Sequence, residues 1–155
     1  MAVTPESELC PVLMDYFTRR TGTAVMATID ADYHPHTAPF HYMTVVDAKH
    51  LLMAISLTTQ TYRNIVENNY VALSLLDEGD LAFCIKGFGK VLLEQMIFER
   101  QLAIIEVEII EIRKNNWESH HVTQGIRIAH KNEIYLINSR KIFQELVKNA
   151  IEYSG

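Results

Sequence analysis

The chain of 155 residues has the usual length of one domain and can bury about two-thirds of its unfolded surface. Hydrophobic residues make up 48% of it and charged residues 21%, a balance that excludes a disordered chain and is typical of a packed globular protein. The formal net charge of −5 argues against nucleic-acid binding, because phosphate contacts require a basic stripe.

The N-terminal residues 1–6 have neither a cationic start nor a long apolar core, so we expect no signal peptide. The apolar runs have the length of strands, so we expect no membrane span and no membrane partner. Cys10 and Cys84 lie far apart and form no CxxC pair, which favours reduced thiols and a cytoplasmic protein. We expect a single domain over residues 1–155.

The first predicted element is an amphipathic helix within Glu6–Arg20. A strand over Ala24–Ile29 and a long strand over His36–Val46 follow, joined by turn-forming residues. The long strand should bend near Pro39, because proline cannot donate a hydrogen bond to a ladder. A third strand over Leu51–Ser56 returns along it.

A helix is predicted over Gln60–Asn69 and a fourth strand over Tyr70–Leu76. Alternating apolar residues predict a long fifth strand over Leu81–Leu93. Gly87 and Gly89 fall on its apolar face, which indicates a tight corner or a close backbone approach.

The sixth predicted strand covers Ala103–Arg113, and its apolar parity changes at Ile109 and Ile110, which indicates a β-bulge. Short strands over Val122–His130 and Glu133–Ile137 are expected to form a hairpin. A C-terminal helix should then begin at Ser139 as its N-cap. Six short strands with a helix inserted after the third suggest a small barrel.

The segment LLMAISLTTQTYRNIVENN, residues 51–69, leads from a strand through hydroxyl side chains into a helix that carries Arg63. Free N–H groups at a helix start, hydroxyls and a guanidinium together favour a phosphate. The alternative is that the threonines only cap the helix and that Arg63 is solvated. Both interpretations remain open on this segment alone.

The histidines predict no metal site. On a strand, His34 and His36 share a face while His41 points the other way. The remaining candidates lack metal-ligand spacing, namely His120, His121 and His130. We therefore expect structural or surface histidines.

Three segments in order resemble the pyridoxamine 5′-phosphate oxidase-like family of FMN-binding split barrels. The first, AVMATIDADYHPHTAPFHYMTVVD, is similar to its strand, Asp-containing turn and proline-bearing strand. The second, LLMAISLTTQTYRNIVENNYVALSLLD, is similar to its strand, phosphate loop, helix and strand. The third, LAFCIKGFGKVL, is similar to its long glycine-containing strand. They span about half of the chain.

The resemblance implies a mainly β (α+β) fold: a six-stranded antiparallel split β-barrel with peripheral helices, including an N-terminal and a C-terminal one. It also implies a homodimer that binds FMN in two clefts between its subunits. The residues that would run along the isoalloxazine are His36, Thr37, Ala38 and Pro39. Those near the ribityl chain are Ser56 and Thr58, and those at the phosphate end are Thr59, Thr61, Tyr62 and Arg63.

Two further residues, Lys86 and Trp117, each have two possible roles. Lys86 is either part of a solvated outer face or a contact to phosphate or flavin across a dimer. Trp117 is either a local anchor or an aromatic wall of the pocket.

The chain departs from the family in two places. Many relatives carry Arg or Lys where this chain has Thr59 and Thr61, which leaves open a weaker phosphate site, a different cofactor or none. True pyridoxamine phosphate oxidases end in a basic segment that contains tryptophan, whereas residues 142–155 here form an amphipathic helix. We therefore do not expect oxidation of pyridoxamine phosphate.

The expected function is a flavin-dependent oxidoreductase acting on a small-molecule electron donor or acceptor, with FMN supplying the chemistry. The alternative is a non-catalytic module that binds flavin or haem, with His36, His41 or the His120–His121 pair as the axial ligand of a haem. A third possibility is a dimeric barrel without a cofactor. The catalytic residues are unknown from the sequence alone.

Overall fold

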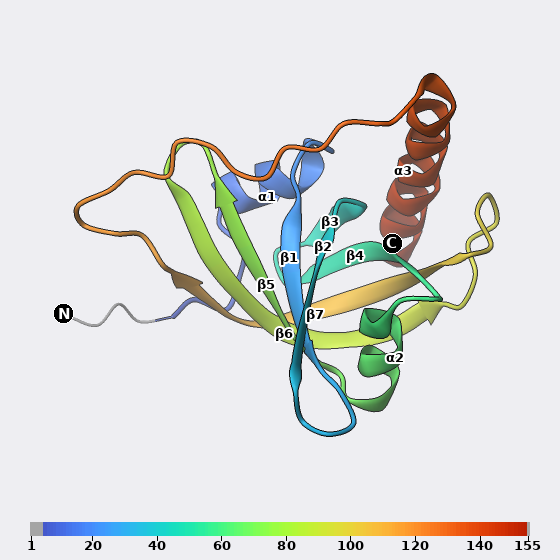
Figure 1. Ribbon diagram of the computed structural model, residues 1–155, viewed down its shortest axis with the longest axis horizontal. Coiled ribbons are helices and arrows are strands. Elements are labelled where there is room, and N and C mark those ends of the chain that lie inside the picture. The colour runs from blue at the N-terminus through green and yellow to red at the C-terminus, as the bar shows by residue number, and fades with distance from the viewer. Residues whose placement is uncertain (1–4, 155) are drawn as a thin grey trace.

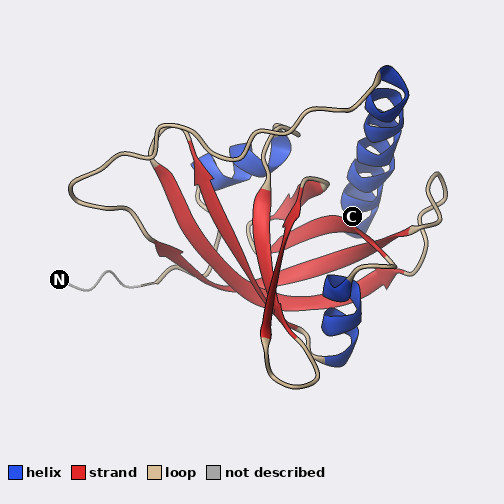
Figure 2. Ribbon diagram, in the orientation of Figure 1, coloured by secondary structure: helices blue, strands red, loops and turns tan. Residues whose placement is uncertain are grey.

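The computed structural model describes residues 5–154. Within them, seven strands form one antiparallel sheet in the order β2-β1-β5-β6-β7-β4-β3, with three helices around it (Figures 1 and 2). The helices are α1 (Pro11–Thr18), α2 (Gln60–Glu67) and α3 (Glu133–Ser154). The strands are β1 (Ala24–Ile29), β2 (Pro35–Phe40), β3 (Met43–Asp47), β4 (His50–Ser56), β5 (Tyr70–Asp77), β6 (Leu81–Leu93) and β7 (Leu102–Lys114).

The predicted fold class is confirmed: the molecule is a mainly β split barrel with helices at its periphery. The sheet curves around an apolar interior, but its two edge strands, β2 and β3, share no ladder within the described residues. The barrel is therefore open between these edges.

The single long strand predicted over His36–Val46 is wrong. The chain leaves the ladder at His41 and Tyr42, so that β2 pairs with β1 while β3 pairs with β4. The carbonyl of Tyr42 instead accepts the N–H of Ala54 at 3.0 Å. Pro39 lies on β2, an edge strand with one neighbour, where a residue without an N–H is tolerated. The break raises the number of strands from six to seven.

The predicted β-bulge is confirmed on β7. Gly87 lies opposite Ile109 while Lys86 lies opposite Glu111, which leaves Ile110 as the extra residue. A Cβ atom on Gly87 would collide with a backbone carbonyl of β7, so the close approach expected at this glycine is also present.

The strand β4 lies between two apolar clusters and is buried on both faces. Leu51, Met53 and Ile55 belong to the interior of the barrel. Leu52 and Ala54 face the opposite way and belong to the cluster beneath α3. α3 packs on β3 and β4 and covers this outer part of the sheet (Figure 1).

The N-terminal helix is shorter than the range Glu6–Arg20 and begins at Pro11, in agreement with a proline in the first turn. Its buried side chains pack into the barrel interior. Cys10, which precedes the helix, and Cys84 on β6 are both free thiols, as predicted.

The hairpin predicted over Val122–His130 and Glu133–Ile137 is wrong. Residues 115–132 have no regular secondary structure, and α3 begins at Glu133. Asn132 Oδ1 accepts the N–H of Tyr135 at 3.0 Å and satisfies a donor of the first turn, whereas Ser139 is buried inside the helix. The apolar side chains of the first turn are mostly exposed, so they do not lie on one buried helical face. Their spacing therefore resembles that of a strand.

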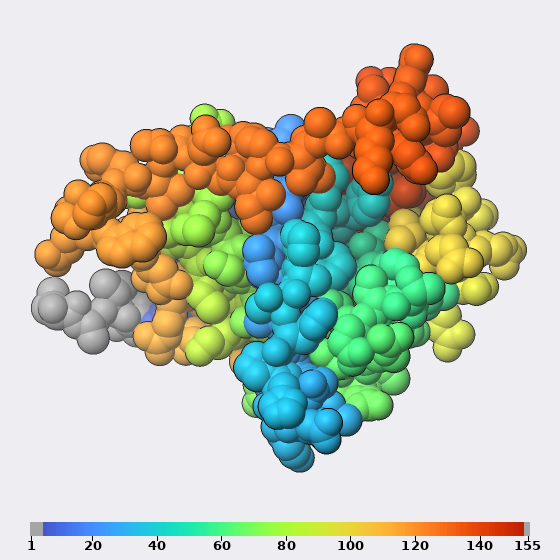
Figure 3. All heavy atoms as spheres, viewed as in Figure 1, coloured from blue at the N-terminus to red at the C-terminus, as the bar shows by residue number. Residues whose placement is uncertain are grey.

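The segment 115–132, which we call the strap, crosses the top of the molecule from β7 to α3 (Figure 3). It covers the end of the β5–β6 hairpin on its way (Figure 1). No helix in residues 5–154 is both long enough and apolar enough to cross a membrane.

Candidate functional site

The turn between β4 and α2 collects the hydroxyl groups predicted for the phosphate end. Thr59 is the N-cap of α2: its Oγ1 accepts the N–H of Tyr62 at 3.2 Å and donates to the carbonyl of Ser56 at 2.7 Å. Ser56 Oγ and Thr58 Oγ1 lie 3.0 Å apart on the exposed side of the turn. Capping therefore occupies the Thr59 hydroxyl but not those of Ser56 and Thr58.

Arg63 is the cation of this turn. Its guanidinium is exposed and donates to Gln60 Oε1 at 2.9 Å, and within the described residues no carboxylate lies close enough to form an ion pair with it. The N–H groups of Gln60 and Thr61 are in the first turn of α2 and have no intrahelical acceptor. A guanidinium without an anionic partner beside free helix N–H groups is an arrangement that accepts an anion.

Thr61 is fully buried, and its Oγ1 has no hydrogen-bond partner among residues 5–154. Buried hydroxyls are normally paired, so Thr61 Oγ1 is an unsatisfied polar atom beneath the start of α2 rather than part of its accessible surface. The accessible groups of Ser56, Thr58 and Arg63 form a set of donors whose chemistry fits a phosphate monoester.

A hydrogen-bonded chain fixes α2 to the sheet. Gln60 Nε2 donates to Asn64 Oδ1 at 2.7 Å, and Asn64 Nδ2 donates to Thr28 Oγ1 on β1 at 3.0 Å. Asn64 and Thr28 are both buried. The start of α2 is thus held rigidly over β1, next to β2.

The four residues predicted on β2 divide between two faces. His36 lies opposite Thr28 in the ladder, so its side chain lies on the face where α2 packs, and Ala38 shares that face. Thr37 and Pro39 are exposed on the outer face of the sheet. The structure therefore brings half of this segment to the α2 side.

An apolar cleft of about 350 Å³ lies along the sheet beyond the β1–β2 hairpin. Lys86 is at its border and is half exposed, with Nζ 3.2 Å from Glu111 Oε2. The lining residues are Ala27, Thr28, Ile29, Pro35, Tyr70, Val71, Ala72, Lys86 and Ile110. Lys86 is thus ion-paired on the outer face and does not lie with the hydroxyl-rich turn of its own chain.

Trp117 is remote from the α2 turn within one chain. It lies on the strap and is 60% exposed, next to Asn116, whose Nδ2 donates to the carbonyl of Asp80 at 2.6 Å. Asp80 is in the turn after β5, whereas α2 precedes the start of β5, and the eight residues of that strand span roughly 26 Å. Trp117 does not anchor the core of its own chain.

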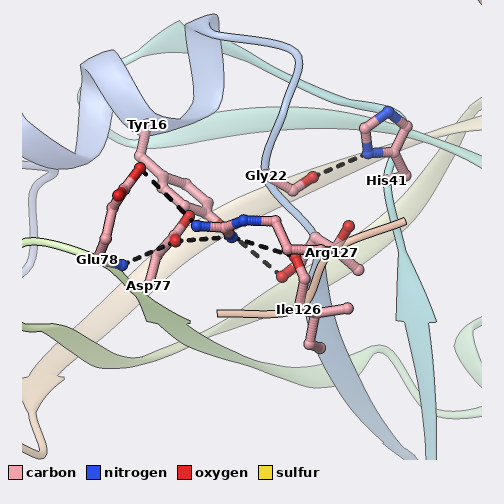
Figure 4. A network of polar contacts seen from close by, with 8 residues as sticks. Tyr16, Gly22, His41, Asp77, Glu78, Ile126 and Arg127 are labelled. Atoms are coloured by element: carbon pink, nitrogen blue, oxygen red, sulfur yellow. Dashed lines mark hydrogen bonds and ion pairs between the residues drawn. The ribbon is translucent and has the colours of Figure 1, made fainter. Parts of the chain in front are cut away.

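Figure 4 shows how the strap and His41 are held. Arg127 Nη1 on the strap donates to Asp77 Oδ1 at 2.9 Å, next to the buried ring of Tyr16. His41 Nδ1 lies 3.0 Å from the carbonyl of Gly22. Burial lowers the pKa of His41, and its ring is fixed by packing, which is the behaviour of a structural histidine.

The fold and the turn define a class: a split barrel with an anion-accepting turn between its fourth strand and its second helix. The chain belongs to the pyridoxamine 5′-phosphate oxidase family, whose model matches residues 13–128. No curated protein matches the chain.

Solved structures of other proteins share the fold. A candidate pyridoxamine 5′-phosphate oxidase of Lactobacillus delbrueckii is 22% identical, with a TM-score of 0.62 over 72% of this chain and 99% of its own. HutZ, the haem storage protein of Vibrio cholerae, is 12% identical, with a TM-score of 0.54 over 71% and 97%. An FMN-binding protein of Syntrophomonas wolfei is 13% identical, with a TM-score of 0.51 over 68% and 82%.

Proposed function

We propose that the protein binds FMN at the turn between β4 and α2 and acts as a flavin-dependent oxidoreductase on a small-molecule electron donor or acceptor. The observation that carries the proposal is the exposed Arg63 guanidinium, which has no ion-pair partner among residues 5–154, on the same turn as the hydroxyls of Ser56 and Thr58. Bound FMN would supply the electron transfer, so no catalytic side chain is required.

In this proposal the protein's own groups bind and orient the cofactor. The donors at the start of α2 would hold the terminal phosphate, and the inward side of β2, with His36 and Ala38, would lie along the ring system. A protein of the same fold, from Syntrophomonas wolfei, is an FMN-binding protein, which supports flavin as the ligand.

The proposal includes a homodimer, because one open barrel is too small to enclose a flavin ring by itself. Exposed apolar side chains on the outer face support a second copy of the chain as the occupant of that face. Tyr70 and Ile110 border the apolar cleft there and are 52% and 39% exposed. In such a dimer Lys86 and Trp117 would be available to the partner's cleft.

Haem is the second candidate ligand, because HutZ, which shares the fold, is a haem storage protein. His120 and His121 are exposed on the strap and available as ligands, in contrast to the packed His41. His120 Nδ1 contacts Ser119 Oγ at 2.7 Å, which leaves Nε2 for an iron.

An absorbance spectrum of the purified protein, followed by titration with FMN and with haemin, tests the proposal. We expect a flavin spectrum, or saturable uptake of one FMN per chain. A strong near-violet band with no flavin uptake would replace FMN by haem, and no uptake of either would contradict both.

The substrate is proposed to differ from pyridoxamine phosphate, because α3 takes the place of the basic C-terminal segment. The FMN-loaded protein should therefore not oxidise pyridoxamine phosphate in the presence of oxygen. Sustained formation of pyridoxal phosphate would contradict this part of the proposal.

A further inference from the structure

We propose that His50, Glu106 and Glu108 form a binding site for a first-row divalent metal ion on the outer face of β4 and β7. One ligand atom of each residue lies within 4.8 Å of the other two. The pairing register explains the cluster. His50 lies opposite Glu108, and Glu106 and Glu108 are two residues apart on β7, so both side chains lie on the same face of the sheet. This site is separate from the α2 turn.

Glu106 is the strongest indication of a ligand. Its side chain is 2% exposed, and its Oε2 has no hydrogen-bond partner in the described part of the chain. A buried carboxylate is costly unless it is paired and hydrogen-bonded. Lys90 Nζ lies 3.6 Å from the other oxygen, Oε1, and the Tyr153 hydroxyl also interacts with this carboxylate. Neither neighbour satisfies Oε2, so a cation at the cluster would complete its coordination.

His50 is oriented as a metal ligand would be. Its Nδ1 lies 2.8 Å from Asp47 Oδ1, and this carboxylate also accepts the N–H of Lys49 at 2.8 Å. A carboxylate on one ring nitrogen fixes the ring and directs the other nitrogen, Nε2, to a metal. The hairpin between β3 and β4 thus supplies both the ligand and its orienting group.

One imidazole and two carboxylates suit a first-row ion such as Zn²⁺ and do not suit Mg²⁺, which prefers oxygen ligands alone. Ligands of a tetrahedral Zn²⁺ lie about 3.4 Å apart, so the ligand atoms, which lie within 4.8 Å of one another, would move together by up to about 1.4 Å for each pair. The exposed side chain of Glu108 can make this movement, and the 63% exposed Lys90 can leave as the metal enters. A fourth position would remain for water.

The experiment is titration of the chelator-treated full-length protein with Zn²⁺, read by calorimetry and by melting temperature. We expect one Zn²⁺ per chain, a rise in melting temperature, and at least tenfold weaker binding for His50→Gln and Glu108→Gln. Asp47→Asn should weaken binding by about ten- to a hundredfold through the orientation of His50. Magnesium should not compete.

His34→Gln is the matched control. His34 lies near Asp30 and Asp32 at the surface, and Asp30 Oδ1 already accepts two backbone N–H groups. This variant should bind Zn²⁺ as the unmodified chain does. Circular dichroism of each variant establishes that it is folded. Equal Zn²⁺ affinity in the folded unmodified chain and the folded His50→Gln and Glu108→Gln variants would overturn the proposal, as would the absence of stoichiometric binding.

Discussion

Arg63 is the residue on which the proposed phosphate contact depends most. A hydrogen bond to a charged group contributes about 1.5–3 kcal/mol, so Arg63→Ala should weaken FMN binding roughly ten- to a hundredfold. Riboflavin, which lacks the phosphate, should bind Arg63→Ala and the unmodified chain equally. Fluorescence titration with both flavins measures the difference, with the exposed Arg100→Ala as the control. Equal losses for FMN and riboflavin would show that Arg63 only maintains the structure.

Asp77, like Asp80, is a carboxylate that holds the strap to the end of the β5–β6 hairpin. Burial alone would raise the pKa of Asp77, but hydrogen bonds from the Glu78 N–H and from Arg127 outweigh burial and lower it below 3.8. A lowered folded-state pKa means that the stabilisation is fully present above the unfolded value of 3.8 and is lost as the pH falls through the folded value.

Arg127→Met should therefore lower the free energy of unfolding by about 1–2 kcal/mol at pH 7, because a charge-assisted bond of a half-exposed group is lost. The difference from the unmodified chain should shrink as the pH falls below the folded-state pKa of Asp77. Urea unfolding at a series of pH values measures it, and Arg100→Met is the control. A difference that is constant down to pH 2 would show that the ion pair is not its source.

At the scale of elements, Glu145 on α3 fixes the turn between β6 and β7. Its carboxylate accepts the N–H groups of Ile97 at 2.8 Å and Phe98 at 2.7 Å. Lys141 adds a contact, with Nζ 5.2 Å from the centre of the Phe98 ring. One side chain of α3 thus ties down a turn that lies far away in the sequence.

Glu145→Gln should free this turn, because a neutral amide has one oxygen and no charge to offer the two donors. We expect amide hydrogen exchange at Ile97 and Phe98 to accelerate about tenfold or more, in line with the loss of one charge-assisted bond. Exchange within β4 should be unchanged, and Glu152→Gln on the exposed side of α3 is the control. Unchanged exchange at both amides would rule out this role of Glu145.

Local signals in the sequence located most of the elements. The alternation of β6 and the parity change at Ile110 predicted the long strand and its bulge, because both arise within one ladder. The break between β2 and β3 could not be predicted, since it occurs where the chain changes partner from β1 to β4, and partners are not visible in one sequence. The first turn of α3 was missed because its apolar side chains remain exposed.

The candidate site divides in the same way. The residues from Ser56 to Arg63 are contiguous, so their gathering at a helix start follows from the local sequence. The positions of Lys86 and Trp117 depend on which face of the sheet each occupies and on the path of the strap, and neither follows from spacing. The buried Glu106 cluster was not predicted at all, because its members meet only through the pairing of β4 with β7.

For the whole molecule we expect a dimer that uses the outer face around the apolar cleft. An obligate interface of this kind buries more than about 2,000 Å². Ile110→Glu places a charge on this face at a residue that is already 39% exposed in one chain, so the barrel should fold but dissociate. Light scattering at micromolar concentration should give a dimer mass for the unmodified chain and a monomer mass for this variant.

Ile134→Glu is the matched control, since Ile134 is 69% exposed on the first turn of α3 and does not line the cleft. It should remain dimeric. A monomer mass for the unmodified chain would contradict the dimer, and a dimer mass for Ile110→Glu would move the interface to another face.

The position of β4, buried on both faces, has a consequence during synthesis on the ribosome. One of its neighbours, β3, precedes it, but the other, β7, ends roughly sixty residues later, and α3 follows later still. At about 5–20 residues per second, the apolar run from Leu51 to Ile55 waits roughly 3–12 seconds for its second ladder. For that time it presents an unpaired hydrophobic edge, which is the kind of segment of a nascent chain that chaperones shield from aggregation.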